Sequence, residues 1–155
     1  MTEINMIEEI NSKKLLTILM ADDDEDDRML AQDALTESRV LNRLHCVENG
    51  VELIQYLEGE GKYADRELYP MPGLILLDLN MPKKDGREAL QEIKANPATR
   101  RIPVVILTTS KAEEDKLRGY DLGAASYISK PVTFSALVDL MQALGKYWIE
   151  FVELP

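Results

Sequence analysis

The chain has 155 residues, of which 45% are hydrophobic and 30% are charged, and its formal net charge is −10 at pH 7. This length fits one domain that buries a full hydrophobic core, and the excess of acidic residues argues against nonspecific binding to nucleic acids or anionic membranes. The single cysteine, Cys46, excludes an intrachain disulfide and a cysteine-rich metal site.

The first segment, residues 1–14, is predicted to be an N-terminal extension and not a targeting signal. It is polar and includes Glu3, Glu8 and Glu9, whereas a signal peptide needs a continuous apolar region. The apolar runs in the sequence are too short to span a bilayer. We therefore expect a soluble cytoplasmic protein in which residues 15–155 form one domain with an extended C-terminal helix and tail.

From residue 15 onward, strand patterns and helix patterns alternate five times. The strands are predicted near 15–21, 44–47, 73–78, 103–108 and 126–129, and the helices near 26–39, 50–58, 86–96, 112–122 and 134–151. This alternation predicts an α/β fold with a doubly wound parallel sheet covered by helices on both faces. Right-handed crossovers then place the first, third and fourth strands side by side.

Local signals support these boundaries. Three predicted helices begin with a pattern typical of a capping box, in which a polar side chain precedes a glutamate by three positions. The loop 59–72 is longer than most connections in such folds and is predicted to be an addition to the basic five units. The capping pairs are Asn49 with Glu52, Asp85 with Glu88, and Ser110 with Glu113.

Polar residues follow four of the predicted strands. In an open parallel sheet the carboxyl ends of the strands meet along one edge, where ligands bind. Carboxylates gathered there repel one another unless a cation lies among them, and oxygen ligands alone favour a hard ion such as Mg²⁺. Asp22 and Asp23 follow the first strand, Asp78 ends the third, Thr108 ends the fourth, and Lys130 follows the fifth.

This set of residues fits the transfer of a phosphoryl group to an aspartate. Asp78 is the candidate nucleophile, because a carboxylate can attack phosphorus and become an aspartyl phosphate. Asp23 is the candidate principal metal ligand, and Thr108 and Lys130 are candidate contacts for the phosphate oxygens. Each residue also has a simpler interpretation, since residues 22–27 could be a solvated acidic turn at a helix start. The order and placement of the whole set favour the functional interpretation.

The motifs together resemble the receiver domain of two-component response regulators, over about residues 15–150. The acidic pair matches Asp22-Asp23, the phosphoacceptor motif matches residues 76–82 with Gly86 after it, the switch hydroxyl matches Thr108, and the Lys-Pro pair matches Lys130-Pro131. The resemblance implies the flavodoxin-like strand order 2-1-3-4-5. It also implies a cis bond between Lys130 and Pro131, an isomer that is accessible only before proline.

The resemblance adds roles for individual residues. Asp78 would accept a phosphoryl group from a phosphohistidine of a sensor histidine kinase. The Mg²⁺ ligands would be Asp23, Asp78 and the backbone carbonyl of Asn80, with Asp22 acting through water. Thr108 would move toward the phosphate, and Tyr127 would change rotamer with it.

A narrower resemblance is to the small regulators that are paired with bacterial phytochromes. It is carried by residues 82–88, by the long loop, and by the ending of the chain from Tyr147 to Pro155. Such regulators lack an output domain and tend to form dimers, and the kinase partner would be of phytochrome type. A homodimer is expected through the predicted helix 112–122, the strand 126–129, the helix 134–151 and the tail, because a second apolar stripe on the last helix suggests a partner surface.

Two other functions remain open on the sequence alone. One is a haloacid-dehalogenase-like phosphatase that uses Mg²⁺ and an aspartyl phosphate, although the Asp-x-Asp motif of such enzymes fits poorly at Asp22-Asp23-Asp24. The other is a dimeric scaffold that works without phosphorylation. The leading hypothesis is a phosphorylation-controlled binding module and not a classical enzyme.

Overall fold

The computed structural model describes residues 16–38, 42–79, 81, 83–108, 123–131 and 133–147. Within them, strands and helices alternate as the sequence predicts, with one short 3-10 helix in the long loop. The elements are β1 (Leu16–Ala21), α2 (Glu25–Ser38), β2 (Asn42–Val47), α3 (Gly50–Glu58), η1 (Gly61–Ala64), β3 (Leu74–Asp78), α4 (Gly86–Ala95), β4 (Val104–Thr108), β5 (Ser126–Ser129) and α6 (Phe134–Tyr147).

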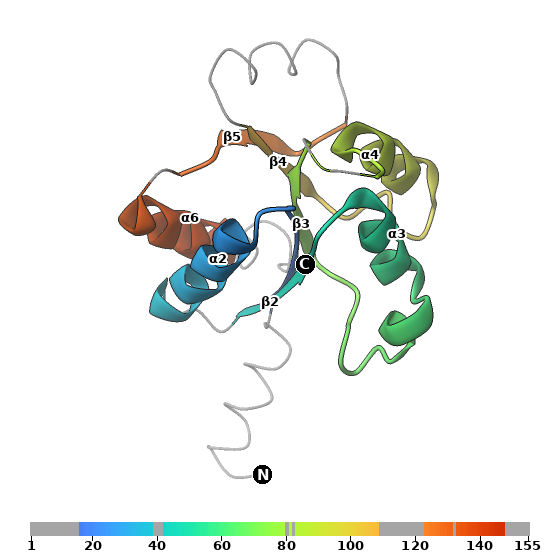
Figure 1. Ribbon diagram of the computed structural model, residues 1–155, viewed down its shortest axis with the longest axis horizontal. Coiled ribbons are helices and arrows are strands. Elements are labelled where there is room, and N and C mark those ends of the chain that lie inside the picture. Colours follow the sequence, from blue (N-terminus) through green and yellow to red (C-terminus); the bar gives the residue numbers. More distant parts are fainter. Residues whose placement is uncertain are drawn as a thin grey trace.

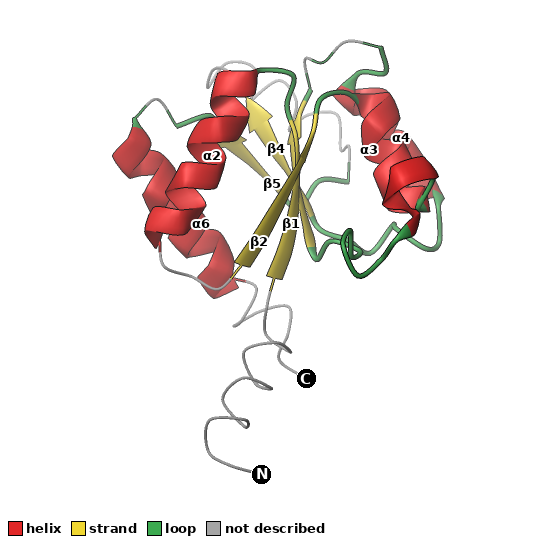
Figure 2. Ribbon diagram, turned by 60° about the horizontal axis from the view of Figure 1, so that its bottom comes forward, coloured by secondary structure: helices red, strands yellow, loops and turns green. Residues whose placement is uncertain are grey.

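The five strands form one parallel sheet in the order β2-β1-β3-β4-β5, which confirms the predicted fold class and strand order (Figure 1). Figure 2 shows the sheet between two helical layers, with α2 and α6 on one face and α3 and α4 on the other. Because all strands point the same way, their carboxyl ends lie along one edge of the sheet.

The sheet separates two hydrophobic cores, and this explains the continuous apolar sequences of its central strands. Every residue of β3 and β4 is buried, as expected for strands covered on both faces. Leu53, Tyr56 and Leu90 belong to the core under α3 and α4. Ala31 and Met141 belong to the core under α2 and α6. The two cores fix the strand ends in position from both sides.

Hydrogen bonds confirm the N-cap side chain in two of the predicted capping pairs. The side chain of Asn49 accepts from the backbone N–H of Glu52 at 2.9 Å, and the side chain of Asp85 accepts from that of Glu88 at 3.0 Å. Each bond satisfies a backbone donor that the first helical turn leaves unpaired. The third predicted pair, at Ser110, lies outside the described residues.

The long loop before β3 packs against α3 through aromatic rings and one arginine. The ring centroids of Tyr63 and Tyr69 are 5.0 Å apart, and both rings contact Tyr56 of α3. The Arg66 guanidinium donates hydrogen bonds to the carbonyl groups of Tyr56 at 2.8 Å and Leu57 at 2.7 Å, near the end of α3. This loop is therefore a packed part of the domain.

Some expectations are corrected or lie beyond what the structure describes. The bond between Lys130 and Pro131 is trans, since the described residues contain no cis peptide bond, so the expected cis bond is wrong for this structure. The predicted helix 112–122 and the chain after residue 147 lie outside the described residues. Among the helices that are described, none is long and apolar enough to cross a membrane.

Candidate functional site

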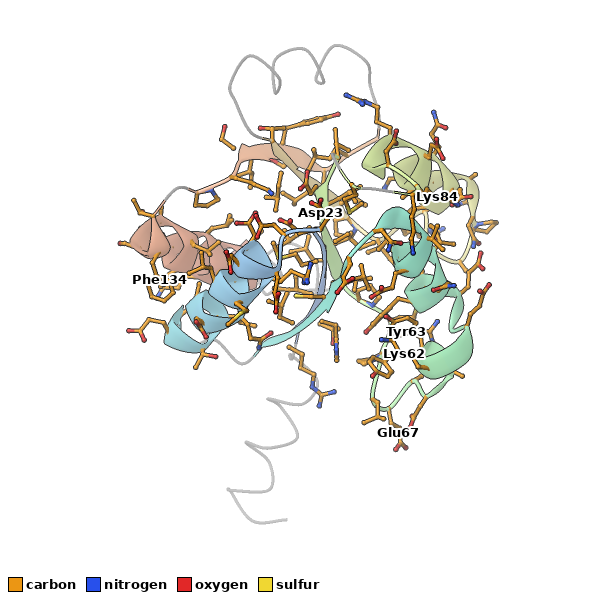
Figure 3. The ribbon with its side chains drawn as sticks, in the orientation of Figure 1. Asp23, Lys62, Tyr63, Glu67, Lys84 and Phe134 are labelled. Atoms are coloured by element: carbon orange, nitrogen blue, oxygen red, sulfur yellow. The ribbon has the colours of Figure 1, made fainter. Side chains whose placement is uncertain are left out.

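The strand ends bring together the polar residues that the sequence singles out. Asp22 is fully buried, Asp78 is 4% exposed and Thr108 is 1% exposed, whereas Asp23 is open to solvent. Figure 3 shows Asp23 at the edge of the sheet, on the loop that leaves β1. The Lys130 side chain reaches the same place from the residue after β5. Asn80 lies outside the described residues, so its predicted part in metal binding remains a prediction.

The loop between β1 and α2 is shaped by its own aspartates. The backbone N–H of Asp24 donates to Oδ1 of Asp22 at 2.9 Å. Oδ1 of Asp24 in turn accepts from the backbone N–H groups of Asp26 at 2.8 Å and Asp27 at 3.3 Å, which begin α2. The acidic run thus serves two purposes, because Asp22 and Asp23 belong to the possible cation site while Asp24 caps α2.

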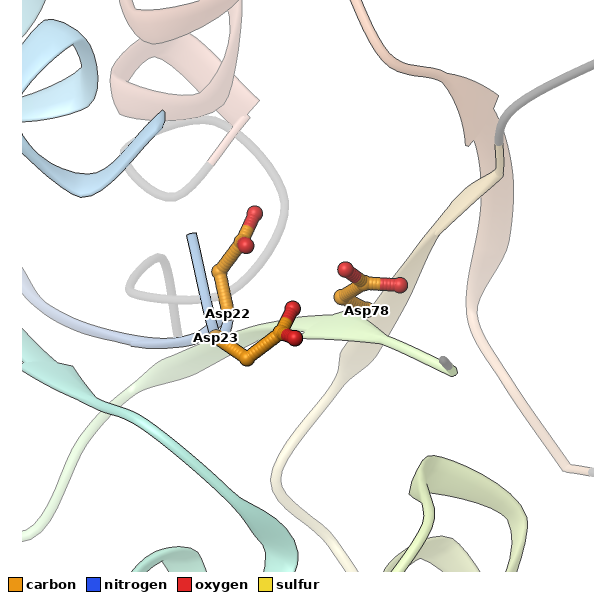
Figure 4. A group of neighbouring side chains, drawn as sticks. All are labelled: Asp22, Asp23 and Asp78. Carbon is orange, nitrogen blue, oxygen red and sulfur yellow. The ribbon is translucent and has the colours of Figure 1, made fainter. Parts of the chain in front are cut away.

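Three carboxylates of this edge could hold one cation. Asp22, Asp23 and Asp78 each offer an oxygen atom, and these three atoms lie within 4.8 Å of one another (Figure 4). Among the described residues, Oδ2 of Asp22 is a buried side-chain oxygen without a hydrogen bond of good geometry, although it lies 2.9 Å from Nζ of Lys130. A buried carboxylate oxygen with unused lone pairs is costly unless a cation compensates it. The residues therefore fit a hard divalent ion that is bound by oxygen ligands.

Lys130 lies at the centre of the charges in this site. Its Nζ atom is 2.9 Å from Oδ2 of Asp22 and 3.0 Å from Oδ2 of both Asp27 and Asp78. The contact with Asp27 was not predicted from the sequence, because this residue lies in the first turn of α2 and its charge is also favourable there for the helix dipole. The spacing of four positions between Asp23 and Asp27 is no signal for this contact, because Asp23 lies in the loop before α2 begins at Glu25.

The surroundings of the site shift the pKa values of Asp22 and Lys130. Burial raises the pKa of Asp22, and the neighbouring Asp78 carboxylate adds to this, against the opposing effects of the Asp24 N–H and Lys130. Burial alone would lower the pKa of Lys130, but its close contacts with the carboxylates of Asp22, Asp27 and Asp78 outweigh burial and raise the pKa above its ordinary value. The lysine is therefore firmly cationic at neutral pH.

Thr108 ends β4, the strand next to that of the phosphoacceptor candidate, and Tyr127 lies on β5, one strand farther along the sheet. The Thr108 hydroxyl donates a long hydrogen bond of 3.5 Å to the carbonyl of Ile128, and the Thr108 carbonyl accepts from the backbone N–H of Lys130 at 2.7 Å. Tyr127 is mostly buried on β5. The hydroxyl is thus weakly held, while its backbone is tied directly to that of the lysine.

The loop after β3 approaches two neighbouring segments too closely for any residue but glycine. The backbone N–H of Gly86 donates to the carbonyl of Leu79 at 3.1 Å, and that of Gly50 donates to the carbonyl of Lys84 at 3.0 Å. A β-carbon on either glycine would collide with the backbone of this loop. Lys83 has a φ of 65°, a left-handed conformation that costs free energy for a residue with a side chain. The loop is therefore pinned close to Asp78.

These features define the class of the protein. It is a doubly wound α/β domain whose strand ends gather three carboxylates, a hydroxyl and a lysine around one potential cation site. The family model described as the response regulator receiver domain matches residues 18–142, and the chain belongs to this family. It is thus a phosphoacceptor signalling domain of a response regulator, as the sequence motifs indicate.

Known relatives agree with this assignment over nearly the whole chain. The response regulator Rcp1 of Synechocystis is 41% identical over 150 residues, which cover 97% of this chain and 99% of that protein. The phosphorylated cyanobacterial phytochrome response regulator RcpA has a crystal structure that superposes with a TM-score of 0.77 at 42% identity, covering 91% of this chain and 99% of that one. The Mn²⁺-bound form of Rcp1 gives a TM-score of 0.73 at 41% identity, covering 90% and 99%.

Proposed function

We propose that Asp78 is the phosphoacceptor and that a sensor histidine kinase is its phosphoryl donor. The observation that carries this proposal is the contact between Asp78 and Lys130, inside a group of carboxylates that could hold a cation. A carboxylate oxygen of Asp78 attacks phosphorus, and the bond from phosphorus to the donor breaks, with its electron pair leaving on the donor. The product is an aspartyl phosphate on the buried end of β3.

The proposed cation is Mg²⁺, held by Asp23, by Asp78 and by the backbone carbonyl of Asn80, with Asp22 acting through water. When bound, such an ion offsets negative charge on the transferred oxygens. Lys130 already lies 3.0 Å from Asp78, and its ammonium would donate to a phosphoryl oxygen without a large movement. These residues also supply the chemistry for phosphorylation by small donors and for loss of the phosphoryl group.

Thr108 and Tyr127 are proposed to transmit the change. The Thr108 hydroxyl would exchange its long bond to Ile128 for a phosphoryl oxygen, a stronger acceptor because it is charged. Tyr127, which is mostly buried on β5, would change rotamer with this movement. Through this step a local change of charge would alter the packing of the neighbouring surface.

The partners in the proposal follow from the relatives. RcpA, by its description, is a phytochrome response regulator, and this favours a kinase of phytochrome type. A cytoplasmic location is part of the proposal. A homodimer through residues 112–122, 126–129 and 134–151 and the tail stays part of the proposal. Phe134, which is 44% exposed at the start of α6 (Figure 3), is consistent with such a surface, and sedimentation of the full chain would test it.

The test of the phosphoacceptor uses Asp78→Asn. The purified full chain is incubated with acetyl phosphate and Mg²⁺, and the intact mass is measured for the gain of one phosphoryl group. Asp78→Asn is expected to remove the gain, whereas Asp33→Asn, on the exposed side of α2, is expected to retain it. Labelling of Asp78→Asn at the wild-type level would refute the assignment. Repeated turnover of a phosphate monoester would instead support the phosphatase, and normal partner binding by Asp78→Asn would support the scaffold.

A further inference from the structure

Asp27 pairs with Lys130 without belonging to the cation group. Its Oδ2 atom lies 3.0 Å from Nζ, the same distance that separates Nζ from Oδ2 of Asp78. Asp22, Asp23 and Asp78 supply the oxygens that could hold a cation, and Asp27 is outside this set. The carboxylate of Asp27 thus contacts the lysine from outside the group of carboxylates that could hold the cation.

We propose that Asp27 is a positioning residue that holds the Lys130 ammonium against Asp78 for phosphoryl transfer. The inference rests on the proposed roles of Asp78 and Lys130. The proposal gives a helix residue, Asp27 of α2, a role in a site whose other residues lie at or just after strand ends.

The geometry favours positioning over competition. A lysine ammonium carries three N–H donors, and Nζ of Lys130 already contacts Asp22, Asp27 and Asp78 at the same time. Lys130 therefore does not have to leave Asp27 in order to reach a phosphoryl group on Asp78. The lysine stem is flexible, and ordering it has an entropic cost. The contact with Asp27 orders the lysine side chain before the phosphoryl group binds, and so part of this entropic cost does not oppose the transfer.

Asp27 itself is fixed by the packing of α2. The backbone N–H of Asp27 donates to Oδ1 of Asp24 at 3.3 Å, which sets the first turn of the helix. Farther along α2, Ala31 and Leu35 are buried in the core that this helix shares with α6 (Figure 2). The Asp27 side chain is 37% exposed and that of Lys130 is 23% exposed, so removal of the carboxylate leaves no deeply buried charge behind.

The test is the rate of phosphorylation of Asp27→Asn, in the full chain with Mg²⁺ and increasing concentrations of acetyl phosphate. The maximal rate is expected to fall about fivefold, which corresponds to the roughly 1 kcal/mol of a partly exposed ion pair. The half-saturating concentration of acetyl phosphate and the affinity for Mg²⁺ are expected to match those of the control. Should the asparagine variant not fold, Asp27→Ala serves the same test, because alanine has the highest helix propensity at a position inside α2.

The matched control is Asp26→Asn. It removes the same charge from the same helical turn, but Asp26 is exposed, and its charge is also near the start of α2. A double variant then separates positioning from a general effect of charge. If Asp27 acts through the lysine, Asp27→Asn has no further effect in a Lys130→Met background.

Two results would overturn the inference. One is an equal maximal rate in Asp27→Asn and Asp26→Asn, and the other is a fully additive effect of Asp27→Asn in the Lys130→Met background. If instead the proposed roles of Asp78 and Lys130 are wrong, Asp78→Asn would still be phosphorylated or Lys130→Met would react at the wild-type rate. These two results are distinct from those that concern Asp27.

Discussion

The backbone of Gly86 lies directly against the carbonyl oxygen of Asp78. A β-carbon at Gly86 would be 2.8 Å from that oxygen and 2.6 Å from Cα of Leu79, and real β-carbons do not approach backbone atoms so closely. Gly86, the first residue of α4, thus sets how close the backbone of Asp78 and Leu79 lies to the start of this helix. This contact connects a motif glycine with the position of Asp78, the proposed phosphoacceptor.

Gly86→Ala is therefore expected to impair phosphorylation more than it impairs folding. The loop has to shift by several tenths of an ångström, and misplacement of a reacting group by about 1 Å can cost roughly 100-fold in rate. Overpacking should lower the free energy of unfolding by about 1–3 kcal/mol. The measurements are the rate with acetyl phosphate and urea denaturation. Gly61→Ala is the control, because its β-carbon meets no atom within 4 Å although its φ is +57°. Wild-type phosphorylation in Gly86→Ala would contradict this view of the loop.

Mg²⁺ is expected to raise the melting temperature of the protein. A ligand that binds only the folded state stabilises it by about 2.7 kcal/mol at 100 times its dissociation constant. The effect should disappear in Asp23→Asn, since Asp23 is an exposed member of the group of carboxylates that could hold the ion. Asp26→Asn should retain it. Thermal unfolding followed by circular dichroism, with and without Mg²⁺, provides the comparison, and an undiminished shift in Asp23→Asn would show that the ion binds elsewhere.

Arg66→Ala is expected to loosen the long loop and the end of α3 together. The guanidinium donates to the carbonyls of Tyr56, Leu57 and Tyr69 at 2.8, 2.7 and 3.3 Å, and hydrogen bonds from charged groups contribute more than neutral ones. A loss of about 2 kcal/mol in the free energy of unfolding is expected, measured by urea denaturation. Arg66→Lys should restore little, because an ammonium cannot form the planar fork. Arg87→Ala, on the exposed face of α4, should be close to neutral.

The sheet could be predicted from sequence because its central strands are covered on both faces. The predicted strands 73–78 and 103–108 each differ from the observed β3 and β4 by one residue. β2 begins two residues earlier than predicted, since its polar start pairs with Leu16 and Thr17 of β1 and has no apolar pattern of its own. The short helix η1 is also absent from the prediction, because one turn of 3-10 helix leaves no periodic signal.

The site was predictable where it depends on strand ends and not where it depends on packing between helices. Asp22, Asp78, Thr108 and Lys130 meet because parallel strands end at one edge. Asp27 reaches the same lysine only because α2 lies at a particular angle on the sheet, and a one-dimensional pattern does not contain that angle. The aspartates around it made the role of Asp27 harder to recognise, since acidic residues at a helix start are already explained by their favourable interaction with the helix dipole.

His45 is expected to make the stability of the protein fall as the pH is lowered. Burial, together with the charge of Arg43, lowers the pKa of this histidine below its ordinary value of 6.5. As the pH falls through 6.5, the unfolded chain binds a proton that the folded chain does not, so stability is complete above this pH and is lost below it. The single histidine signal in a proton NMR titration should have its midpoint below 6.5.

The matching stability measurement compares wild type with His45→Gln by urea denaturation between pH 5.5 and 7.5, a range above the ordinary pKa of Asp and Glu, at about 4. Asp22, whose pKa is raised by burial, acts with the opposite sign, because stability from such a carboxyl increases as the pH falls. Only the difference between the two proteins therefore reports on the histidine. Wild type should lose more stability than His45→Gln on acidification, since the ring packs against Tyr56 and Tyr69 at centroid distances of 5.8 and 5.5 Å and its cation would lose hydration there. Equal losses in both, with an NMR midpoint at or above 6.5, would mean that the ring is solvated in the folded protein.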